Sequence, residues 1–378
     1  MSFGIYIHFP FCKRKCRYCD FPSEAGREDL IPAYIRALIF EINSFAEAYQ
    51  SRFDGPDTIY FGGGTPTLVG MENLYKVTEE LLNGFGAENV VEFTVEVNPG
   101  TVNLTFFRNL KKLGVNRISL GVQSFNDAIL KSLGRIHTAK DARAAITAAQ
   151  KAGFENISLD LMYGLPGQTM IDWQKTLVEA TSLGVKHISA YGLQVEEGTD
   201  FYKLLTGGKL NLPDDETEAA MYELMCSYLP LRGYARYEIS NFAKPSSLCL
   251  HNFGYWTNKQ YLGMGASGAS FIENFRWSNV ADVKQYIELL EHERLPAKFE
   301  HRTIKIAMSE FCFLALRTTR GIERAEFFRV FGREIDEIYS ACMAELIDDG
   351  LLEDDSEWLR LTALGFKYAN RAFVSFLL

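Results

Sequence analysis

Apolar runs recur along the first half of the chain, each bounded by glycine, proline or charged residues, and they predict buried β-strands. Between these runs, apolar residues return every three or four positions, which is typical of amphipathic helices; Ile31, Ile35, Leu38 and Ile42 are one example. The alternation of strands and helices predicts an α/β fold with a parallel sheet. The six predicted strands are residues 4–9, 58–61, 92–97, 117–121, 156–162 and 187–192.

A short sequence repeat supports this alternation. Residues 113–119 read Leu-Gly-Val-Asn-Arg-Ile-Ser, and similar runs occupy residues 152–158 and 183–189. In each run the glycine fits the left-handed conformation that ends a helix, and the apolar residues after it begin a strand. Units built alike predict a (β/α) barrel, and six strands are fewer than the eight of a full TIM barrel, so we expect a partial (β/α)6 barrel. An open doubly wound sheet would have the same local pattern.

The pattern changes after residue 192. Helices are predicted at 199–206 and 215–229, followed by stretches that mix short strands with glycine-rich loops. A helical domain is predicted from residue 295, and its last part, a helix, two short strands and a final helix, is typical of a winged helix. The expected organisation is a barrel core over 1–200, a barrel extension over 201–294 and a C-terminal winged-helix-like domain over 295–378.

Charge narrows the range of partners. The 378 residues include 39 Lys and Arg against 48 Asp and Glu, and the net charge of −9 argues against a nucleic-acid or anionic-membrane partner. The predicted recognition helix of the winged-helix domain is also acidic and would repel phosphates. Its acidic residues are Glu334, Asp336, Glu337, Glu345, Asp348 and Asp349. No apolar run approaches the ~20 residues that span a bilayer, so we expect a soluble, cytoplasmic protein.

The strongest chemical signal is a group of three cysteines, Cys12, Cys16 and Cys19, in a loop after the first predicted strand. Disulfides are a poor explanation, because the total of seven cysteines is odd and the N-terminus does not resemble a secretory signal. Three thiolates in one loop suit a cubane iron-sulfur cluster in which cysteine binds three irons and the fourth iron is open to an exchangeable ligand.

Zinc is the alternative metal, with His8, or Cys249 and His251, completing the ligand set. Structural zinc sites usually combine two short motifs of closely spaced Cys or His ligands, however, and the chain has no second motif that matches the first. Cations surround the three cysteines, and we expect them to lower the thiol pKa values and so to favour the thiolates that bind iron. They are Lys13, Arg14, Lys15 and Arg17.

The spacing Cys12-x-x-x-Cys16-x-x-Cys19 resembles the signature of the radical S-adenosylmethionine (SAM) superfamily. Further motifs are similar to those of the branch that contains oxygen-independent coproporphyrinogen III oxidase and the HemW heme chaperones. The resemblance implies a [4Fe-4S] cluster whose open iron is chelated by the amino and carboxylate groups of SAM. Reduction of the cluster would cleave the sulfonium to a 5'-deoxyadenosyl radical, with an electron donor such as flavodoxin or ferredoxin.

Polar residues follow the ends of the predicted strands, where the active sites of parallel barrels lie. In order, they resemble the SAM-binding set of this family: Tyr6, Gly63, Gly64, Thr65, Glu96, Gln123, Arg135 and Asp160. The resemblance implies that Tyr6 and Arg135 contact the SAM carboxylate. The glycine-rich segment with Thr65 and Glu96 would contact the amino end. The ribose would lie against Gln123 and Asp160. Acceptors suit an amino group, and a guanidinium suits a carboxylate. The catalytic residues are not identified.

A second motif, His251-Asn252-x-x-Tyr255-Trp256, resembles the heme-binding motif of the HemW branch. By that resemblance His251 is a candidate axial ligand of heme iron. The nearby Cys249 is a second candidate ligand, and a buried, inert thiol is the alternative interpretation of it. For His251 the alternative is a buried histidine that serves only as a hydrogen-bonding group.

Three features bear on the choice between the two branches. The oxidase has a fourth cysteine where this chain has Phe21, as HemW does. The chain also begins on its first strand, without the oxidase's N-terminal extension. Against these, HemW proteins commonly carry Gly-Ala-His near residues 263–265, and here Ala269 stands in place of the histidine.

The resemblance therefore implies a HemW-like heme chaperone that binds a [4Fe-4S] cluster, SAM and heme, and delivers heme to an acceptor such as a membrane respiratory enzyme. The enzymatic alternative is oxidative decarboxylation of coproporphyrinogen III in porphyrin and heme biosynthesis. The third alternative is a zinc-stabilised binding module. Whether SAM is cleaved or only bound stays open, and a homodimer is a further expectation.

Overall fold

A continuous series of parallel strands forms the centre of the fold. The computed structural model describes residues 2–49, 52–300 and 302–378. All six predicted strands are present, and their order in the sheet follows their order in the sequence. In a doubly wound sheet the strand order reverses at a switch point, so this order excludes that alternative and confirms the partial barrel. The strands are β1 (Phe3–Phe9), β4 (Pro56–Gly63), β5 (Glu92–Val97), β6 (Arg117–Gln123), β7 (Asn156–Tyr163) and β8 (His187–Gly192).

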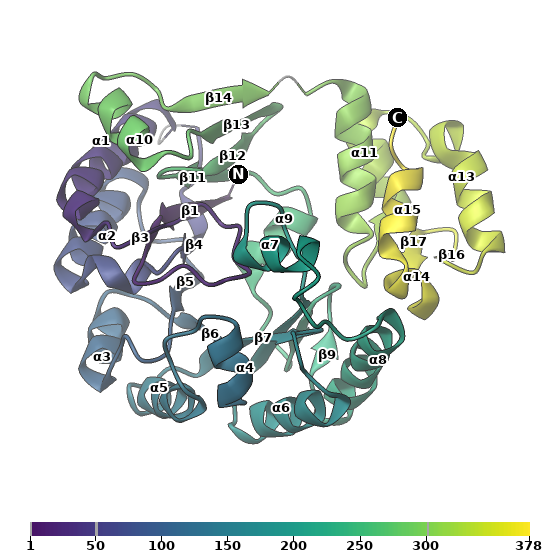
Figure 1. The fold of residues 1–378 in the computed structure, drawn as a ribbon. Coiled ribbons are helices and arrows are strands. Elements are labelled where there is room, and N and C mark those ends of the chain that lie inside the picture. Colours follow the sequence, from purple (N-terminus) through teal and green to yellow (C-terminus); the bar gives the residue numbers. More distant parts are fainter. Residues whose placement is uncertain (1, 50–51, 301) are drawn as a thin grey trace.

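Further strands extend this sheet at both edges. At one edge β11 (Tyr261–Met264) pairs in parallel with β1, and three antiparallel strands continue from it. These are β12 (Ala269–Ile272), β13 (Phe275–Asn279) and β14 (Ala297–Glu300). At the other edge β10 (Asn241–Ala243) and β9 (Ala235–Arg236) follow β8 in antiparallel order. The sheet thus curves without closing (Figure 1) and runs past residue 295, where the sequence predicts the start of the C-terminal domain.

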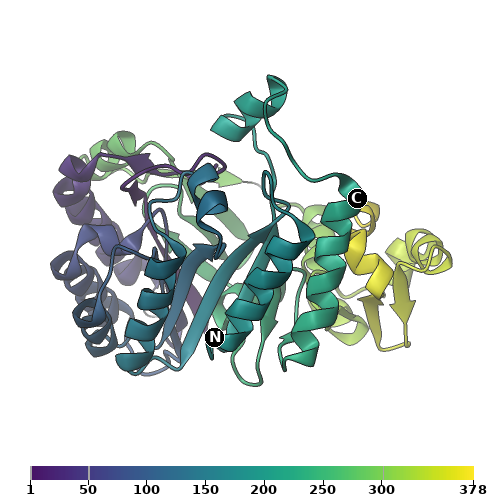
Figure 2. The same ribbon diagram turned by 60° about the horizontal axis from the view of Figure 1, so that its bottom comes forward.

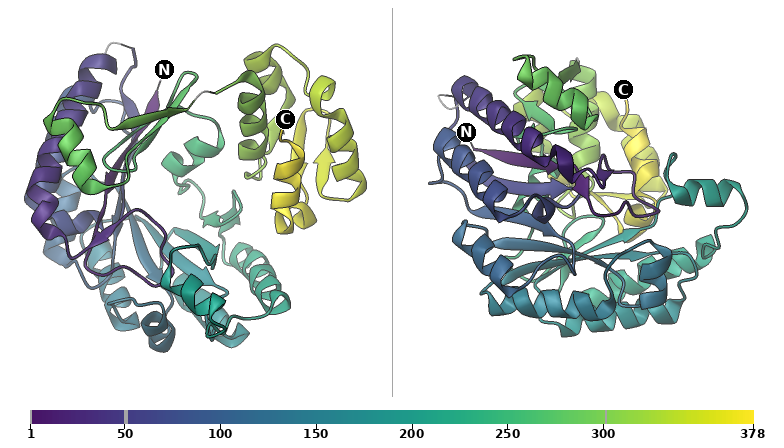
Figure 3. Two further views of the ribbon diagram at one scale, coloured as in Figure 1. Left: turned by 45° about the horizontal axis from the view of Figure 1, so that its top comes forward. Right: turned by 60° about the vertical axis from the view of Figure 1, so that its left-hand side comes forward.

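Helices cover the outer face of the curved sheet (Figures 1 and 3). The three repeat glycines follow α3, α5 and α6 and have φ angles of 95°, 88° and 72° at Gly114, Gly153 and Gly184, as the repeat predicts. Among the described residues, no helix combines the length and the apolarity needed to cross a membrane. The outer helices are α1 (Ile31–Tyr49), α2 (Met71–Phe85), α3 (Leu104–Lys112), α5 (Ala139–Lys151), α6 (Met170–Ser182) and α8 (Asp215–Leu231).

Shorter elements surround the mouth of the barrel. The strands β2 (Phe11–Cys12) and β3 (Glu24–Ala25) pair in parallel and close the loop that carries the three cysteines. An arm that bears α7 (Asp200–Thr206) projects from the barrel (Figure 2). The helix α9 (Leu250–Trp256) lies near the centre of Figure 1. The remaining elements are the 3-10 helices η1 (Glu28–Leu30) and η2 (Pro66–Val69), with α4 (Asp127–Ser132) and α10 (Val283–Glu291).

The C-terminal part has a hydrophobic core of its own, formed by buried residues between Met308 and Phe376. Its three-stranded sheet has the order β15-β17-β16 and packs with five helices, the arrangement expected of a winged helix. The elements are α11 (Ile304–Ala315), β15 (Ile322–Glu323), α12 (Arg324–Phe331), α13 (Asp336–Asp348), β16 (Leu352–Asp354), β17 (Trp358–Leu361), α14 (Ala363–Lys367) and α15 (Ala369–Ser375).

A few specific contacts join this part to the barrel. Glu238 and Thr318 form an isolated antiparallel bridge between the backbones. The guanidinium of Arg236 lies 3.9 Å from the ring centre of Phe366, within the range of a cation–π interaction. The ammonium of Lys367 pairs with the carboxylate of Glu223 on α8 at 2.5 Å. These contacts place the C-terminal part beside the open edge of the barrel (Figure 3).

Candidate functional site

A cavity of about 1340 Å³ opens at the mouth of the barrel and reaches the C-terminal part. Ligand pockets commonly measure about 300–1,000 Å³, so this cavity has room for more than one ligand. Residues far apart in the sequence line it, and they include all twelve of the site residues predicted from the sequence. These are Tyr6, Cys12, Cys16, Cys19, Gly63, Gly64, Thr65, Glu96, Gln123, Arg135, Asp160 and His251.

Backbone hydrogen bonds fix the cysteine loop against three neighbouring segments. The amide of Arg17 donates to the carbonyl of Leu133 at 3.0 Å, and the amide of Phe201 on the projecting arm donates to the carbonyl of Arg17 at 2.9 Å. Behind the loop, the Nε2 atom of His8 lies 2.8 Å from the carbonyl oxygen of Pro22. The loop is therefore held in place by the fold before any metal binds.

The pKa values of the thiols differ from those that the sequence predicts. Burial raises the pKa of Cys12 and raises that of Cys19 to about 11 in the metal-free protein, so the predicted lowering is wrong for these two. The reason is that Lys13, Arg14 and Lys15 are exposed, where water screens their charge. Inside the cavity, the guanidinium of Arg135 contacts a thiol, because its Nη1 lies 3.5 Å from the Sγ of Cys16.

The space around the thiols fits a cluster of several atoms. An added Cβ on Gly64 would lie 2.7 Å from the carbonyl oxygen of Phe11 and 3.0 Å from the Sγ of Cys12, so glycine is required for this approach. All three cysteines are free thiols that face the same cavity. Among the described residues, no group of three His, Cys, Asp or Glu side chains is placed to hold one metal ion.

The zinc ligands proposed from the sequence are not available to these cysteines. The two ring nitrogens of His8 lie 3.0 Å from the hydroxyl of Tyr6 and 2.8 Å from the carbonyl of Pro22. His251 lies against Gly4 at the start of β1, whereas the cysteines follow its end. From Gly4 to Phe9 the strand spans roughly 16 Å. This arrangement therefore supports neither zinc alternative.

Glu96 near the end of β5 is an acid that contacts the glycine-rich segment. Its carboxylate accepts hydrogen bonds from the hydroxyl of Tyr60 at 2.8 Å and from the amide of Gly63 at 3.1 Å. Burial raises the pKa of Glu96 to about 7, because the charged form loses its hydration. The carboxyl group can thus change its charge near neutral pH, which is common in binding and active sites.

The positions of the Gln123 and Arg135 side chains are set by an irregular end of β6. Gln123 has a φ angle of 65°, and the pairing of β6 with β7 shifts register just before it. Such a bulge redirects a side chain at the end of a strand, and a non-glycine residue at positive φ marks local strain. Gly121 leaves room here, because its Cβ would lie 3.3 Å from the side chains of both Arg135 and Gln123.

Asn98 is a member of this site that the sequence prediction missed. Its amide nitrogen donates to the Oγ1 of Thr65 at 2.7 Å, and its oxygen accepts from the Nη2 of Arg135. It therefore joins the glycine-rich segment to the arginine predicted to bind the SAM carboxylate. The only sequence signal was its position two residues after Glu96, at the end of the same strand.

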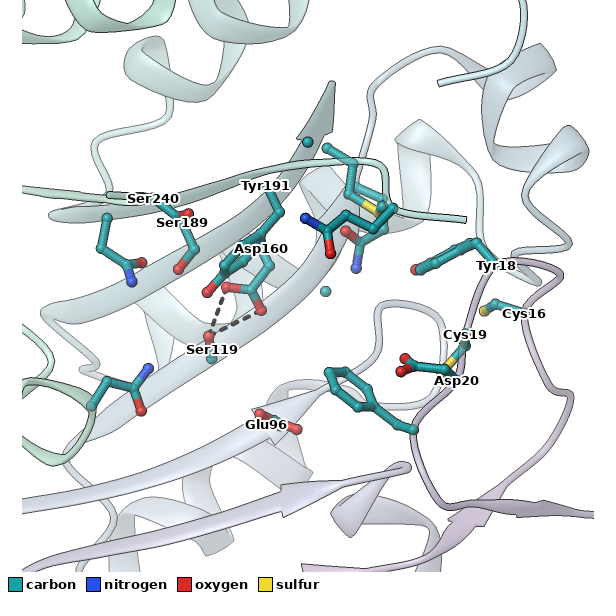
Figure 4. Close-up of a pocket in the computed structure, with 18 of the residues that line it drawn as sticks. Cys16, Tyr18, Cys19, Asp20, Glu96, Ser119, Asp160, Ser189, Tyr191 and Ser240 are labelled. Carbon is teal, nitrogen blue, oxygen red and sulfur yellow. Dashed lines mark hydrogen bonds between the residues drawn. The ribbon is translucent and has the colours of Figure 1, made fainter. Parts of the chain in front are cut away.

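Asp160 extends into the cavity from β7, and Figure 4 shows it beside Ser119 on the neighbouring strand. The hydroxyl of Ser119 lies 3.0 Å and 3.1 Å from the two carboxylate oxygens. Burial raises the pKa of Asp160 as well. The position of this acid, on the same side of the cavity as Gln123, agrees with the predicted contact to a ribose, which stays a prediction.

His251 lies on α9 at the far end of the cavity from the cysteines. Its Nδ1 is 2.9 Å from the hydroxyl of Thr58, and its Nε2 is 2.8 Å from the hydroxyl of Tyr255. The ring stacks on that of Tyr60, with centres 5.2 Å apart. Burial lowers the pKa of His251 to about 3, so the ring is neutral, as a metal ligand must be. To bind iron through Nε2, the ring would have to release Tyr255.

Three further positions that the sequence analysis connects with heme binding or with the choice of branch differ in exposure. Cys249 is completely buried and does not line the cavity, and burial raises its pKa to about 12, so the buried-thiol interpretation holds for it. Ala269 is exposed at the start of β12 and does not line the cavity either. Phe21, in contrast, lines the cavity with 63% of its surface exposed.

Comparison with protein families gives two matches. The family described as "Radical SAM superfamily" matches residues 6–180, and the "HemN C-terminal domain" matches residues 305–367. The first range contains the cysteine loop and every predicted SAM-binding residue. The second covers most of the C-terminal winged-helix-like domain.

Curated relatives resemble the chain over its whole length. It is 40% identical to "Heme chaperone HemW" of Bacillus subtilis, with 98% of each chain covered. It is 37% identical to the protein of the same name from Lactococcus lactis, with 99% of this chain and 97% of the relative covered. Among solved structures, coproporphyrinogen III oxidase (HemN) of Escherichia coli matches with a TM-score of 0.87 at 22% identity, covering 99% of this chain and 90% of the other.

The position of the cysteines predicts the effect of removing one of them. After anaerobic reconstitution with iron and sulfide, Cys16→Ala should lose most of its iron and its broad visible absorbance, because one iron loses its thiolate. Cys342→Ser is the matched control, since Cys342 lies in the C-terminal domain outside the cavity, and should keep both. Iron retained in Cys16→Ala at the level of the control would contradict the ligand role.

Proposed function

Because the chain belongs to the HemW family within the radical SAM superfamily, we propose that it is a heme chaperone, which holds a [4Fe-4S] cluster, SAM and heme and delivers the heme to an acceptor protein. The observation that carries this proposal is the shared cavity. The residues proposed for cluster and SAM and the His251 motif proposed for heme line one continuous space. Cargo and cofactor would therefore share one cavity.

Cys12, Cys16 and Cys19 would hold the cluster, which supplies an open iron for SAM and accepts one electron when reduced. Tyr6 and Arg135 would contact the SAM carboxylate, and Glu96 with the glycine-rich segment would contact its amino group. The support is geometric, because Glu96 already accepts a hydrogen bond from the Gly63 amide. A buried acceptor beside glycine backbone is suited to an amino group.

Aromatic side chains support the heme half of the proposal. Tyr60 stacks on His251 and lies with Tyr255 and Trp256 along the cavity wall, and Phe21 is exposed at the mouth. Flat, apolar surfaces of this kind suit a tetrapyrrole. His251 is the proposed iron ligand because it is the neutral imidazole in this wall, although its Nε2 must first release the Tyr255 hydroxyl.

The charge of the cysteine loop and the reduced state of the cysteines support the proposed electron donor and compartment. The exposed cations of the cysteine loop, Lys13, Arg14 and Lys15, would attract an acidic electron donor such as flavodoxin or ferredoxin. All seven cysteines are free thiols, which suits a reducing cytoplasm. The heme acceptor that we propose is a respiratory enzyme, and the homodimer stays a prediction.

Oxidative decarboxylation of coproporphyrinogen III is the competing function, and a direct assay distinguishes the two. The cluster-loaded protein is incubated anaerobically with SAM, a strong reductant and coproporphyrinogen III, and the porphyrins are analysed by mass. We expect no loss of carboxyl groups, together with transfer of bound heme to an apo-acceptor. Decarboxylated product would make the protein an oxidase despite Phe21 and would overturn the chaperone proposal.

The raised pKa of Glu96 predicts that SAM binding depends on pH. An ionised carboxylate accepts hydrogen bonds with both oxygens, so binding should strengthen as the pH rises through the pKa of about 7. Between about pH 6 and about pH 8 the ionised fraction rises about tenfold, and the SAM affinity of the wild type relative to Glu96→Gln should rise with it. Calorimetric titration of both cluster-loaded proteins measures this ratio. A ratio that does not change with pH would exclude the contact.

The hydrogen bonds of His251 predict opposite effects for two neighbouring substitutions. His251→Ala should weaken hemin binding and change the spectrum of the bound iron, while the cluster absorbance stays unchanged. Tyr255→Phe removes the hydroxyl that occupies Nε2, so it should keep or increase hemin affinity. Hemin titrations monitored by absorbance test both variants, with thermal unfolding as the stability control. Unchanged hemin affinity in His251→Ala would eliminate the ligand role.

A further inference from the structure

The wall of the cavity formed by the C-terminal domain contains an arginine whose charge is not paired. Arg317 lies two residues beyond the end of α11 and reaches across to the barrel. Its guanidinium carbon is 4.5 Å from the ring centre of Trp256 and 5.5 Å from that of Phe373. Trp256 is the last residue of α9, the helix that carries His251. The two aromatic rings hold the guanidinium plane in a fixed position beside the cavity.

Among the residues that the structure describes, none forms an ion pair or a side-chain hydrogen bond with Arg317, and its Nε is buried without a partner. Burial lowers the pKa of Arg317, and Glu238 opposes this only through its charge, without contact. A half-buried guanidinium that faces a cavity without an acceptor is costly to maintain. An anionic group in the cavity would remove this cost. Trp256 has an indole N–H that is also buried without a partner.

Three other cations of the cavity wall already have partners. Arg371 pairs with Asp349, and Lys367 pairs with Glu223. Arg135 contacts Cys16 and donates to the carbonyl of Gly121 at 2.6 Å. Arg117, at the first residue of β6, also has no ion pair among the described residues and has a buried Nε without a partner, but it is fully buried at the opposite end of that strand from the mouth, near the charge of Glu92. The exposed lysines and arginine of the cysteine loop lie at the other end of the cavity from His251.

We propose that Arg317 binds a carboxylate of the tetrapyrrole, that is, a propionate side chain of heme. The inference rests on the proposed heme-binding function and adds the residue that recognises the acidic edge of the ligand. From His251 to Trp256 the helix α9 rises by roughly 7.5 Å. A macrocycle with its iron at His251 would have the reach to bring its edge to the Trp256–Arg317 pair. A planar guanidinium suits a carboxylate, because two N–H groups can donate to its two oxygens.

This contact would also connect the two parts of the protein through the ligand. Arg317 belongs to the C-terminal domain, whereas Trp256 and His251 belong to the barrel extension. A ligand bound at its iron by α9 and at its carboxylate by Arg317 bridges them. The C-terminal domain thereby takes part in holding the cargo.

Esterified heme tests the proposal, because hemin dimethyl ester keeps the iron and the ring but has no carboxylates. The wild type should bind hemin about tenfold or more tightly than the diester, as expected for a charge-assisted hydrogen bond. Arg317→Met keeps a side chain that packs on Trp256 but removes the charge. It should lower hemin affinity by a similar factor and leave diester affinity unchanged. Absorbance titrations give the dissociation constants of the wild type and of Arg317→Met, each for hemin and for the diester.

Arg320→Met is the matched control. Arg320 stacks on Trp358 at 4.8 Å in the same domain, pairs with Glu323 and does not line the cavity, so its loss should change neither constant. A preference for hemin that persists in Arg317→Met overturns the proposal. Equal loss of both ligands would indicate a purely structural role and overturns it too. If the wild type binds neither hemin nor diester, the proposed heme-binding function itself fails.

Discussion

The carboxylate of Glu92 at the start of β5 determines where one half of the cavity is built. It accepts hydrogen bonds from the amides of Leu250 at 2.8 Å and His251 at 3.0 Å, the first residues of α9. A seven-residue helix is too short to be stable alone. A buried acid at its N-terminus satisfies amides that have no partner within the helix and interacts favourably with the helix dipole. The ring of His251 and the indole of Trp256 are placed by this contact.

Tyr60 connects that half of the cavity to the other. Its hydroxyl donates to Glu96 at 2.8 Å, and its ring stacks on His251 at 5.2 Å. The group proposed to contact SAM and the group proposed to bind heme iron are thus separated by one side chain. Because Glu96 has a pKa of about 7, its carboxyl group can be charged or neutral near neutral pH. The hydroxyl of Tyr60 is in direct contact with this carboxyl group. The two proposed ligand regions are thus joined by the contacts of Tyr60, even though the cysteines lie roughly a strand's length from His251.

Much of this arrangement could be predicted from the sequence because it depends on local patterns. Apolar runs gave the six strands, the glycines of the repeat gave the helix ends, and strand ends indicated where polar residues would gather. What the sequence could not show depends on contacts between distant residues. The thiol pKa values follow burial rather than nearby lysines, and the role of Asn98 depends on Thr65 and Arg135, both more than thirty positions away. Likewise, nothing near residue 317 indicates that it lies beside Trp256.

The way in which the C-terminal domain is attached has a consequence for release of a ligand. Its described contacts with the barrel include the Arg236–Phe366 and Arg317–Trp256 stacking, an ion pair between Lys367 and Glu223, a largely buried ion pair between Arg276 and Glu310, and the short bridge at Thr318. A cation–π contact and a surface ion pair each contribute only about 1 kcal/mol or less. The domain has a hydrophobic core of its own, against which Ile239 of the barrel extension also packs. A carrier needs to bind its cargo firmly and yet release it without unfolding. One wall of the cavity thus belongs to a domain with its own core, and release of a ligand that bridges the two parts requires these contacts, the Arg276–Glu310 pair included, to be broken or rearranged.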